Sequence, residues 1–206
     1  FQGYLILEKK MIMRQVNFLL IVLLVMACDV GNSKQSVFNK KRVNDPTSTS
    51  SSPSETAVKA IGKRTFATLR TVHGNIMFKF YPNEAPNTVH RFIQLTESGF
   101  YNGVVFHRVI PNFVIQGGDP TGTGRGGSGK KLKAEFNSQI HIKGTVAMAR
   151  SQSVDSADSQ FYIALNTLPH LDGKYTIFGQ VTEGWEVLDK ISKGDKIISA
   201  TIEHRK

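Results

Sequence analysis

The amino-acid sequence predicts a mainly β protein in which many short strands form a closed barrel, accompanied by two α-helices. Two observations support this class: short apolar segments end repeatedly at glycine turns, and the alternating strand–helix–strand pattern of a parallel sheet is absent. The chain has 206 residues, 40% of them hydrophobic, which suits one domain with appendages. We expect this domain at residues 63–206, with its first strand near Thr65.

The first element is predicted to be a β-hairpin. Apolar side chains recur at residues 66–72 and again at residues 76–80, and the sequence His-Gly-Asn at residues 73–75 supplies the turn between them. A helix should follow from Pro86, because proline is favoured at the first helical position. Gly99 is placed to end that helix, since glycine is favoured just past a helical C-terminus.

The remaining elements are short. Strands are expected at residues 104–109, 113–116, 145–149, 161–165, 176–181 and 196–202, and the second helix at about residues 185–191. Glycine-rich segments separate several of these strands, as is common in antiparallel sheets. No internal repeat interrupts this pattern.

The segment from Phe106 to Gly129, FHRVIPNFVIQGGDPTGTGRGGSG, is the most informative part of the chain. Arg108 stands among apolar residues, and a buried or half-buried arginine is costly unless it is paired or used. Asp119 and the glycines after it indicate a loop whose backbone turns tightly and approaches something closely. We therefore expect a rigidly held cationic donor beside an apolar pocket and an amide, supplied by Phe113, Val114 and Gln116.

Four blocks occur in order along the chain: FHRVIPNFVIQGGD (106–119), GTVAMAR (144–150), SQFYIAL (159–165) and LDGKYTIFGQV (171–181). Together they resemble the cyclophilin family of peptidyl-prolyl isomerases, and the Met-Ala-Arg form of the second block resembles its bacterial branch. The resemblance covers roughly residues 65–203. It implies an eight-stranded antiparallel β-barrel capped by two α-helices, peptidyl-prolyl cis-trans isomerase activity, and no cofactor.

The implied reaction requires no nucleophile, metal or proton shuttle. Rotation about an X-Pro bond meets a barrier of ~18–20 kcal/mol because the nitrogen lone pair is delocalised, and twisting the bond localises that pair on nitrogen. A donor aimed at the nitrogen then binds the transition state better than the ground state. We expect Arg108 to be this donor, since a guanidinium stays charged. The alternative is a structural salt bridge between Arg108 and a carboxylate.

The resemblance implies the other site residues. Phe113 and Gln116 join Arg108 at the catalytic positions, with Gln116 orienting the arginine. The expected substrate-binding residues, which line the proline pocket, pair with the peptide backbone or form a flanking wall, are Val114, Ala149, Arg150, Gln160, Tyr162, His170, Leu171 and Tyr175. The alternative for any one of the apolar residues is a place in the core.

Three residues depart from the family pattern. Tyr162 stands where the family usually has phenylalanine, and its hydroxyl needs a partner if it is buried. His170 stands where eukaryotic relatives usually have tryptophan, which helps to hold the inhibitor cyclosporin, so weak inhibition is expected. Arg150 replaces the more usual asparagine of eukaryotic members. No metal site is expected, because metal-ligand spacing is missing at His73, His90 and His141.

The N-terminal residues have the pattern of a bacterial lipoprotein leader. The apolar run from Phe18 to Ala27 follows basic residues and is too short to span a bilayer as a helix, which takes about 20 residues. It ends at Cys28, the only cysteine, in a sequence that resembles a lipobox. We expect residues 1–27 to be a leader, whose first ten residues we exclude from the fold, Cys28 to carry lipid, and residues 28–62 to be a disordered tether. The alternatives are an ordinary signal peptide and an uncleaved anchor.

Three function hypotheses fit these features. The first is a monomeric isomerase, lipid-anchored in the bacterial cell envelope, that acts on proline-containing peptides and on unfolded or folding proteins. The second is a proline-peptide clamp or chaperone with weak catalysis, favoured if Tyr162 spoils the pocket. The third is a surface lipoprotein that uses the barrel as a scaffold. Intact catalytic positions favour the first. The net charge of +10 is interpreted as a solvated basic surface, since no aromatic-interleaved basic motif predicts nucleic-acid binding.

Overall fold

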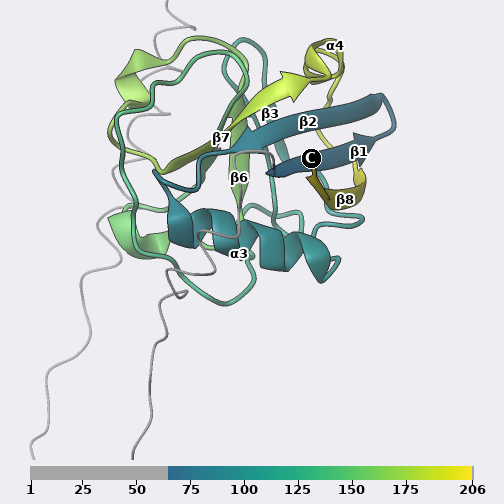
Figure 1. The fold of residues 1–206 in the computed structure, drawn as a ribbon. Coiled ribbons are helices and arrows are strands. Elements are labelled where there is room, and N and C mark those ends of the chain that lie inside the picture. The colour runs from purple at the N-terminus through teal and green to yellow at the C-terminus, as the bar shows by residue number, and fades with distance from the viewer. Residues whose placement is uncertain (1–64, 206) are drawn as a thin grey trace, which may run out of the picture. The chain divides into compact units, whose positions relative to one another are not determined.

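The structure, a computed structural model, describes residues 65–205 (Figure 1). Eight strands form one antiparallel sheet in the order β3-β4-β6-β5-β7-β2-β1-β8. The strands are β1 (Thr65–Thr71), β2 (Gly74–Phe80), β3 (Arg108–Ile110), β4 (Val114–Gly117), β5 (Thr145–Met148), β6 (Phe161–Ala164), β7 (Ile177–Glu183) and β8 (Ile197–His204). The helices are α3 (Pro86–Glu97) and α4 (Trp185–Leu188), with 3-10 turns η1 (Val154–Ser156) and η2 (Pro169–Leu171). The predicted leader, Cys28 and the tether lie outside the described residues.

The sheet is curled and open, which differs from the closed barrel predicted. β3 and β8 are its two ends, and within residues 65–205 no ladder joins them. The segments that lead into these strands meet in a single bridge, between Val105 and Lys196, beside a backbone hydrogen bond from Phe106 N to Asp195 O of 2.8 Å. The strand predicted at residues 104–109 is shortened to β3 (Arg108–Ile110). The first half of the predicted segment does not pair with β4, because Val105 bridges to Lys196 at the other end of the sheet.

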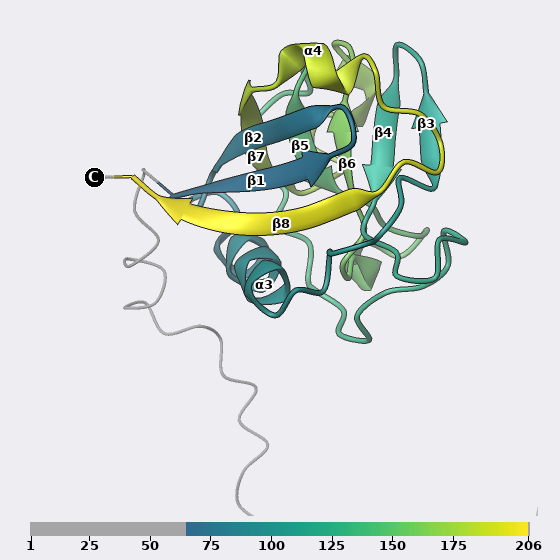
Figure 2. The ribbon, with the colours of Figure 1, turned by 90° about the vertical axis from the view of Figure 1, so that its right-hand side faces the viewer.

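The two helices lie at opposite ends of the curled sheet (Figures 1 and 2). α3 runs beneath β8 in Figure 2 and buries Val89, Phe92 and Ile93. α4 starts at Trp185, as predicted, but ends sooner than expected, at Leu188. Its backbone then leaves the helical pattern, with Lys190 N donating to Val187 O at 3.0 Å.

An aromatic cluster forms the centre of the core between α3 and the sheet. Phe92 of α3 stacks on Tyr101 with ring centroids 4.8 Å apart, and it meets Phe78 and Phe161 edge-on at 5.5 and 5.4 Å. All four rings are at most 2% exposed. Edge-to-face aromatic pairs add about 0.5–1.5 kcal/mol each beyond the area they bury. Phe92 therefore links the helix predicted from the apolar stripe after Pro86 to the sheet.

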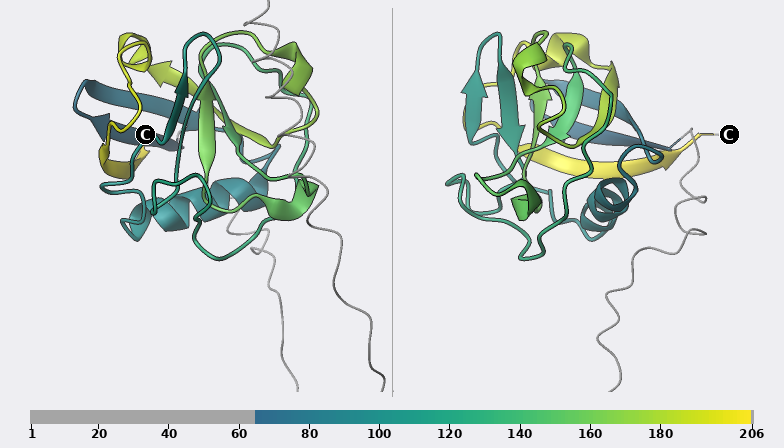
Figure 3. Two further views of the ribbon diagram at one scale, coloured as in Figure 1. Left: turned by 180° about the vertical axis from the view of Figure 1, so that it is seen from behind. Right: turned by 90° about the vertical axis from the view of Figure 1, so that its left-hand side faces the viewer.

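A second apolar cluster lies on the strands that carry the site. It is made of Val114, Ala147, Tyr162, Ala164, Leu168 and Ile177. These residues come mainly from β4, β6, β5 and β7, which are consecutive in the sheet and curl together in the views of Figure 3.

No helix among residues 65–205 is long and apolar enough to cross a membrane.

Candidate active site

Two of the predicted catalytic residues, Arg108 and Gln116, lie in one row with Tyr162 across neighbouring strands. The register pairs Arg108 of β3 with Gln116 of β4, and pairs Gln116 with Tyr162 of β6. Directly opposed residues on neighbouring antiparallel strands carry their side chains on the same face of the sheet. The local hairpin of β3 and β4 and the distant strand β6 thus meet on one face.

This face holds a pocket of about 160 Å³, which we call the small pocket. It is lined by Arg108, Phe113, Val114, Gln116, Ala149, Arg150, Tyr162, Leu171 and Tyr175. Every predicted site residue except Gln160 and His170 is therefore in this lining. Val114 and Tyr162 are buried and belong to the second apolar cluster, whereas the charged residues Arg108 and Arg150 are not buried.

The turn between β3 and β4 places Phe113 at the small pocket. Asn112 adopts a left-handed backbone with φ of 59°, a conformation that asparagine tolerates better than most residues. Phe113 N donates to Ile110 O at 3.1 Å and so closes the turn that contains Pro111 and Asn112. Phe113 then lies beside the guanidinium of Arg108, whose carbon is 5.5 Å from the ring centroid.

Arg108 is exposed, which corrects the expectation that its apolar neighbours would bury it. The reason is that β3 is the end strand of an open sheet. Its Nη1 donates to Gln116 Oε1 at 3.2 Å. No ion pair among residues 65–205 includes Arg108, so the alternative of a structural salt bridge is not found there. The guanidinium is oriented by an amide and keeps donors free.

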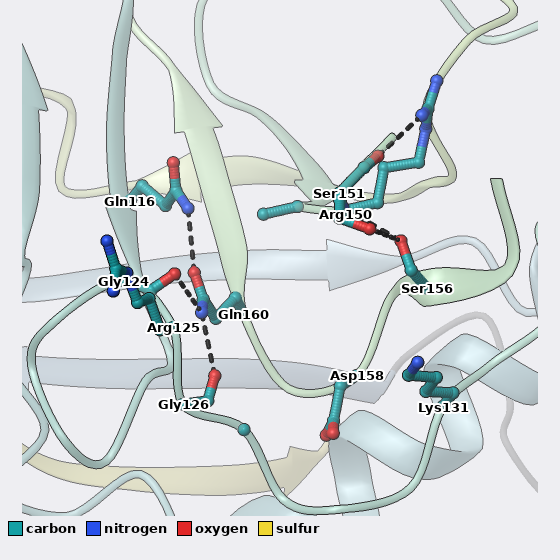
Figure 4. A pocket seen from close by; sticks show the side chains of 12 residues that line it. Gln116, Gly124, Arg125, Gly126, Lys131, Arg150, Ser151, Ser156, Asp158 and Gln160 are labelled. Atoms are coloured by element: carbon teal, nitrogen blue, oxygen red, sulfur yellow. Dashed lines mark hydrogen bonds between the residues drawn. The ribbon is translucent and has the colours of Figure 1, made fainter. Parts of the chain in front are cut away.

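Gln160 connects this arginine to the glycine-rich loop through a chain of hydrogen bonds (Figure 4). Gln116 Nε2 donates to Gln160 Oε1 at 3.0 Å. Gln160 Nε2 donates in turn to the carbonyl oxygens of Gly124 and Gly126, at 3.1 and 2.8 Å. Because carbonyl oxygens only accept, both amides have a set orientation, and Gln116 must present its oxygen to Arg108.

The glycine-rich loop is held by a buried carboxylate, Asp119, which is 0% exposed. Asp119 Oδ1 accepts from Thr121 N and Thr121 Oγ1, each at 2.8 Å, and Oδ2 accepts from Gly124 N at 2.6 Å. Burial by itself raises the pKa of Asp119, but the hydrogen bonds from Thr121, Gly126 and Gly124 outweigh it and hold the pKa well below its usual range. Asp119 is therefore ionised and fixes the loop that carries the two carbonyls.

Gly118, the glycine just before Asp119, makes a close approach to the protein's own backbone. Gly118 has φ of 87°, and a Cβ added there would lie 2.3 Å from the carbonyl oxygen of Ser159. Ser159 Oγ donates to Gly118 O at 2.7 Å, which joins the start of the loop to the residue before Gln160. Only glycine allows this contact.

A larger cavity of about 460 Å³ adjoins the small pocket, and we call it the loop cavity (Figure 4). It shares Gln116, Ala149 and Arg150 with the small pocket and is otherwise lined by Gly124, Arg125, Gly126, Gly127, Lys131, Ser151, Ser156, Asp158 and Gln160. The sequence analysis missed it. The available signal was a pair of basic residues, Arg125 within the glycine run and Lys131 after it.

Asp158 gives the loop cavity a second carboxylate anchor. Its side chain accepts from Ser128 N at 2.8 Å, from Gly129 N at 2.9 Å, and from the Ser128 hydroxyl. A Cβ added to Gly127 would lie 2.7 Å from Asp158 Oδ2. The loop wall is therefore held by carboxylates that accept backbone N–H groups, rather than by apolar packing.

Tyr162 has the partner that its buried hydroxyl needs. The hydroxyl oxygen lies 2.8 Å from His141 Nε2, and His141 Nδ1 lies 2.7 Å from Asp172 Oδ1. Burial raises the pKa of the Tyr162 phenol, so it is neutral. His141 is 0% exposed and entered the sequence analysis only as a rejected metal ligand. No group of residues in the described part of the chain is arranged to hold a metal ion.

The two remaining departures lie at the rim. His170 does not line the small pocket, but its ring is stacked on Phe113 at 6.0 Å between centroids, with 11° between the planes. The Arg150 guanidinium lies 4.8 Å from the centre of the Tyr175 ring, and its Nε donates to Lys174 O at 3.0 Å. Both side chains therefore brace aromatic residues of the pocket wall.

Comparison with known proteins identifies one family. The family model described as "Cyclophilin type peptidyl-prolyl cis-trans isomerase/CLD" matches residues 66–204. A peptidyl-prolyl cis-trans isomerase of Helicobacter pylori is 46% identical over 143 residues, which cover 68% of this chain and 87% of the relative. Peptidyl-prolyl cis-trans isomerase B of Bacillus subtilis is 45% identical over 130 residues, which cover 62% of this chain and 90% of the relative.

A solved structure agrees with the sequence comparison. The crystal structure of a cyclophilin type peptidyl-prolyl cis-trans isomerase of Cryptosporidium parvum, obtained in the presence of the dipeptide Ala-Pro, is similar with a TM-score of 0.64 and 30% identity. The match covers 68% of this chain and 99% of that chain. The similarity thus spans the described sheet and the small pocket.

Proposed function

This chain belongs to the cyclophilin family and is a peptidyl-prolyl cis-trans isomerase, and on that premise we propose that Arg108 is its catalytic donor and that its substrates are exported or envelope proteins. The observation that carries the catalytic part is the hydrogen bond from Arg108 to Gln116 at the rim of a small apolar pocket. The observation that carries the substrate part is the lipobox-like sequence ending at Cys28.

The small pocket suits the ring of a proline residue. Phe113, Val114, Tyr162 and Leu171 offer apolar surface, and a volume of about 160 Å³ has room for one small side chain rather than a large one. A proline ring held there leaves its imide nitrogen at the rim, on the side of Arg108. Burial of the proline ring supplies binding energy that fixes the ring, so that the peptide cannot simply rotate as a whole when the X-Pro bond twists.

Arg108 then acts on the twisted bond. In the planar ground state the imide nitrogen is a poor acceptor, because its lone pair is delocalised into the carbonyl. At the twisted transition state the pair is localised and accepts a hydrogen bond from a guanidinium N–H. Gln116 Oε1 accepts from Nη1 at 3.2 Å, which orients the fork while its other donors stay free. No proton is transferred and no covalent bond is formed.

The alternative of a proline-peptide clamp depended on the Tyr162 hydroxyl spoiling the pocket, and the contacts of that hydroxyl argue against this. The hydroxyl is hydrogen-bonded to His141, and Tyr162 is only 5% exposed while its ring still lines the small pocket. A pocket wall of this kind offers proline an aromatic ring with its polar group already paired. We therefore favour the enzyme over a proline-peptide clamp.

The catalytic proposal is tested by Arg108→Ala in a proline-isomerisation assay, with Arg70→Ala as the matched control. Both arginines are exposed on strands, but Arg70 lies on β1 and lines neither cavity. We expect Arg108→Ala to lower kcat/KM at least about tenfold, which is about 1.4 kcal/mol of transition-state stabilisation. Unchanged activity in a folded Arg108→Ala protein contradicts the mechanism, whereas Arg70→Ala should match the wild type.

The localisation proposal concerns residues outside the described part of the chain. Lipid on Cys28 would tether the isomerase to a membrane, with residues 28–62 as a spacer that lets the pocket reach its substrates. Intact-mass analysis of the mature protein should show a lipid-modified N-terminal cysteine, and Cys28→Ser should abolish the modification. An unmodified thiol, or cleavage elsewhere, refutes the anchor and leaves the isomerase activity untouched.

A further inference from the structure

Three polar side chains form a line behind the small pocket, and one of them, Tyr162, belongs to the second apolar cluster. Asp172 follows η2, His141 precedes β5, and Tyr162 lies on β6 and forms part of the pocket wall. The Asp172–His141 and His141–Tyr162 contacts measure 2.7 and 2.8 Å. A fully buried histidine is expensive unless both of its ring nitrogens are paired, as they are here.

The direction of these hydrogen bonds follows from the groups at the Asp172 end. Asp172 Oδ1 also accepts from the backbone N–H of His141 at 2.8 Å. This bond, followed by the one from the His141 ring, holds the pKa of Asp172 below its usual range, so Asp172 is a carboxylate that only accepts. Nδ1 of His141 must therefore carry a proton, and in the neutral ring Nε2 offers a lone pair to the hydroxyl of Tyr162.

The aromatic contacts of Tyr162 agree with this hydrogen bond. The rings of His141 and Tyr162 are nearly coplanar, with 11° between their planes, as an end-on hydrogen bond allows, and Tyr175 meets Tyr162 edge-on with centroids 5.7 Å apart. Tyr175 is covered in turn by the Arg150 guanidinium. The hydroxyl of Tyr162 is thereby turned toward His141, and the ring is left to face the pocket.

We propose that the Asp172–His141–Tyr162 line is a positioning device that makes tyrosine usable as a wall of the proline pocket and so sets the affinity for the X-Pro segment. His141 is its positioning residue, and it touches no substrate. The inference rests on the isomerase function above. Without His141, the phenol would have to be buried unpaired or rotate toward the small pocket, and the second outcome obstructs the proline ring.

The test is a double-mutant cycle of His141→Leu, Tyr162→Phe and the two combined. Leucine is close to histidine in volume but offers no hydrogen bond, and Asp172 keeps both the backbone N–H of His141 and access to solvent. Steady-state kcat and KM are measured with a tetrapeptide that contains an Ala-Pro bond, and urea unfolding is measured for each variant. His73→Phe is the matched control, because it removes another histidine–aspartate contact, that of His73 with Asp195, whose members line neither cavity.

We expect His141→Leu to raise KM about tenfold with kcat within about twofold of the wild type. In the Tyr162→Phe background the same His141→Leu change should alter KM less than about threefold, because no phenol is left to be positioned. A purely structural role for His141 predicts the opposite split: a smaller active fraction lowers kcat, leaves KM unchanged, and does so equally in the Tyr162→Phe background.

The inference is overturned if folded His141→Leu binds the peptide like the wild type, or if it raises KM as much in the Tyr162→Phe background. Should His141→Leu not fold, the wild-type protein decides: nitrogen-15 NMR of the imidazole must show the proton on Nδ1, and a proton on Nε2 alone refutes the line. If the wild type shows no turnover, the Kd of the same tetrapeptide replaces KM. Failure of turnover then counts against the proposed function, and an effect of His141→Leu that persists in the Tyr162→Phe background counts against this inference.

Discussion

The small pocket and the loop cavity lie side by side, share Gln116, Ala149 and Arg150, and are built on different physical principles. The small pocket is a feature of paired strands, with Val114 and Tyr162 buried in an apolar cluster. The wall of the loop cavity is irregular backbone tied to the carboxylates of Asp119 and Asp158. The strands of the small pocket are therefore held mainly by non-directional burial, and the wall of the loop cavity is held by directional, charge-assisted hydrogen bonds.

This difference predicts different sensitivities. Apolar packing is nearly indifferent to pH. A loop that depends on a buried carboxylate fails when that carboxylate is removed or protonated. Gln160 is the link, because it joins the loop carbonyls to Gln116 in the row of catalytic residues. Loss of the loop structure should therefore disturb the orientation of Arg108 through the side-chain amides of Gln160 and Gln116.

The largest expected effect comes from Asp119→Ala. It leaves the backbone N–H groups of Thr121 and Gly124 and the hydroxyl of Thr121 without their buried acceptor, so we expect a loss of about 3 kcal/mol in the free energy of unfolding. Urea denaturation measures it. Asp155→Ala is the matched control, since Asp155 is exposed and accepts a single backbone N–H, from Ala134 at 2.9 Å. Equal losses in both variants would show that burial of Asp119 is unimportant.

The second prediction concerns acid. The pKa of Asp119 is lowered in the folded protein, so its contribution to stability is complete above the unfolded-state pKa of about 4 and is lost as pH falls below that value. The lowered pKa values of Asp172 and Asp195 act with the same sign. Urea midpoints measured between neutral pH and about pH 2 should fall more steeply for the wild type than for Asp119→Asn. Parallel curves would contradict this assignment.

Gln160→Ala should have a smaller effect, on activity rather than stability. It breaks the chain of amides between the two sites, and Gln116 is then free to turn its nitrogen toward Arg108. We expect kcat/KM to fall about fivefold, in line with the loss of the one neutral hydrogen bond that orients Gln116, from its Nε2 to Gln160 Oε1. The isomerisation assay used for Arg108 measures the change, and Gln152→Ala serves as an exposed control outside both linings. Wild-type activity in Gln160→Ala would mean that the two sites are independent.

The smallest effect is expected at the rim of the small pocket. His170 is exposed and stacked on Phe113, so His170→Trp should leave isomerisation within about twofold of the wild type. It should strengthen inhibition by cyclosporin, because tryptophan offers more apolar area and an indole N–H. Inhibition curves of the two proteins compare them directly. Tight inhibition of the unmodified protein would show that this rim position matters less than we argue.

The parts of the site that the sequence analysis found share a property. Arg108, Phe113 and Gln116 lie within one short block whose two strands form a local hairpin, and the pocket residues of β6 and η2 lie within the other blocks. Short-range strand pairing and apolar periodicity are visible in a linear sequence. The helix starting at Pro86 and the first hairpin were accessible for that reason, whereas the pocket residues outside residues 106–119 were identified through the family resemblance.

Other features depend on which distant residues meet, and local patterns carry no record of that. The exposure of Arg108 follows from β3 being the end strand of an open sheet, which no property of residues 106–119 reveals. His141 looked like an isolated histidine because its partners follow 21 and 31 residues later. Gln160 was assigned to a flanking wall, but its role as a link depends on the loop carbonyls 36 and 34 residues away from it.

The sequence by itself determined the family, the antiparallel strands, the two helix starts and the identity of the residues around the small pocket, because each of these is written in residue types over a few neighbouring positions. Only the tertiary structure decided that the sheet stays open, that a second cavity adjoins the first, and that Tyr162, His141 and Asp172 form one hydrogen-bonded line. Each of these depends on hydrogen bonds between segments far apart in the chain, and such bonds require precise distances and directions that exist only after folding.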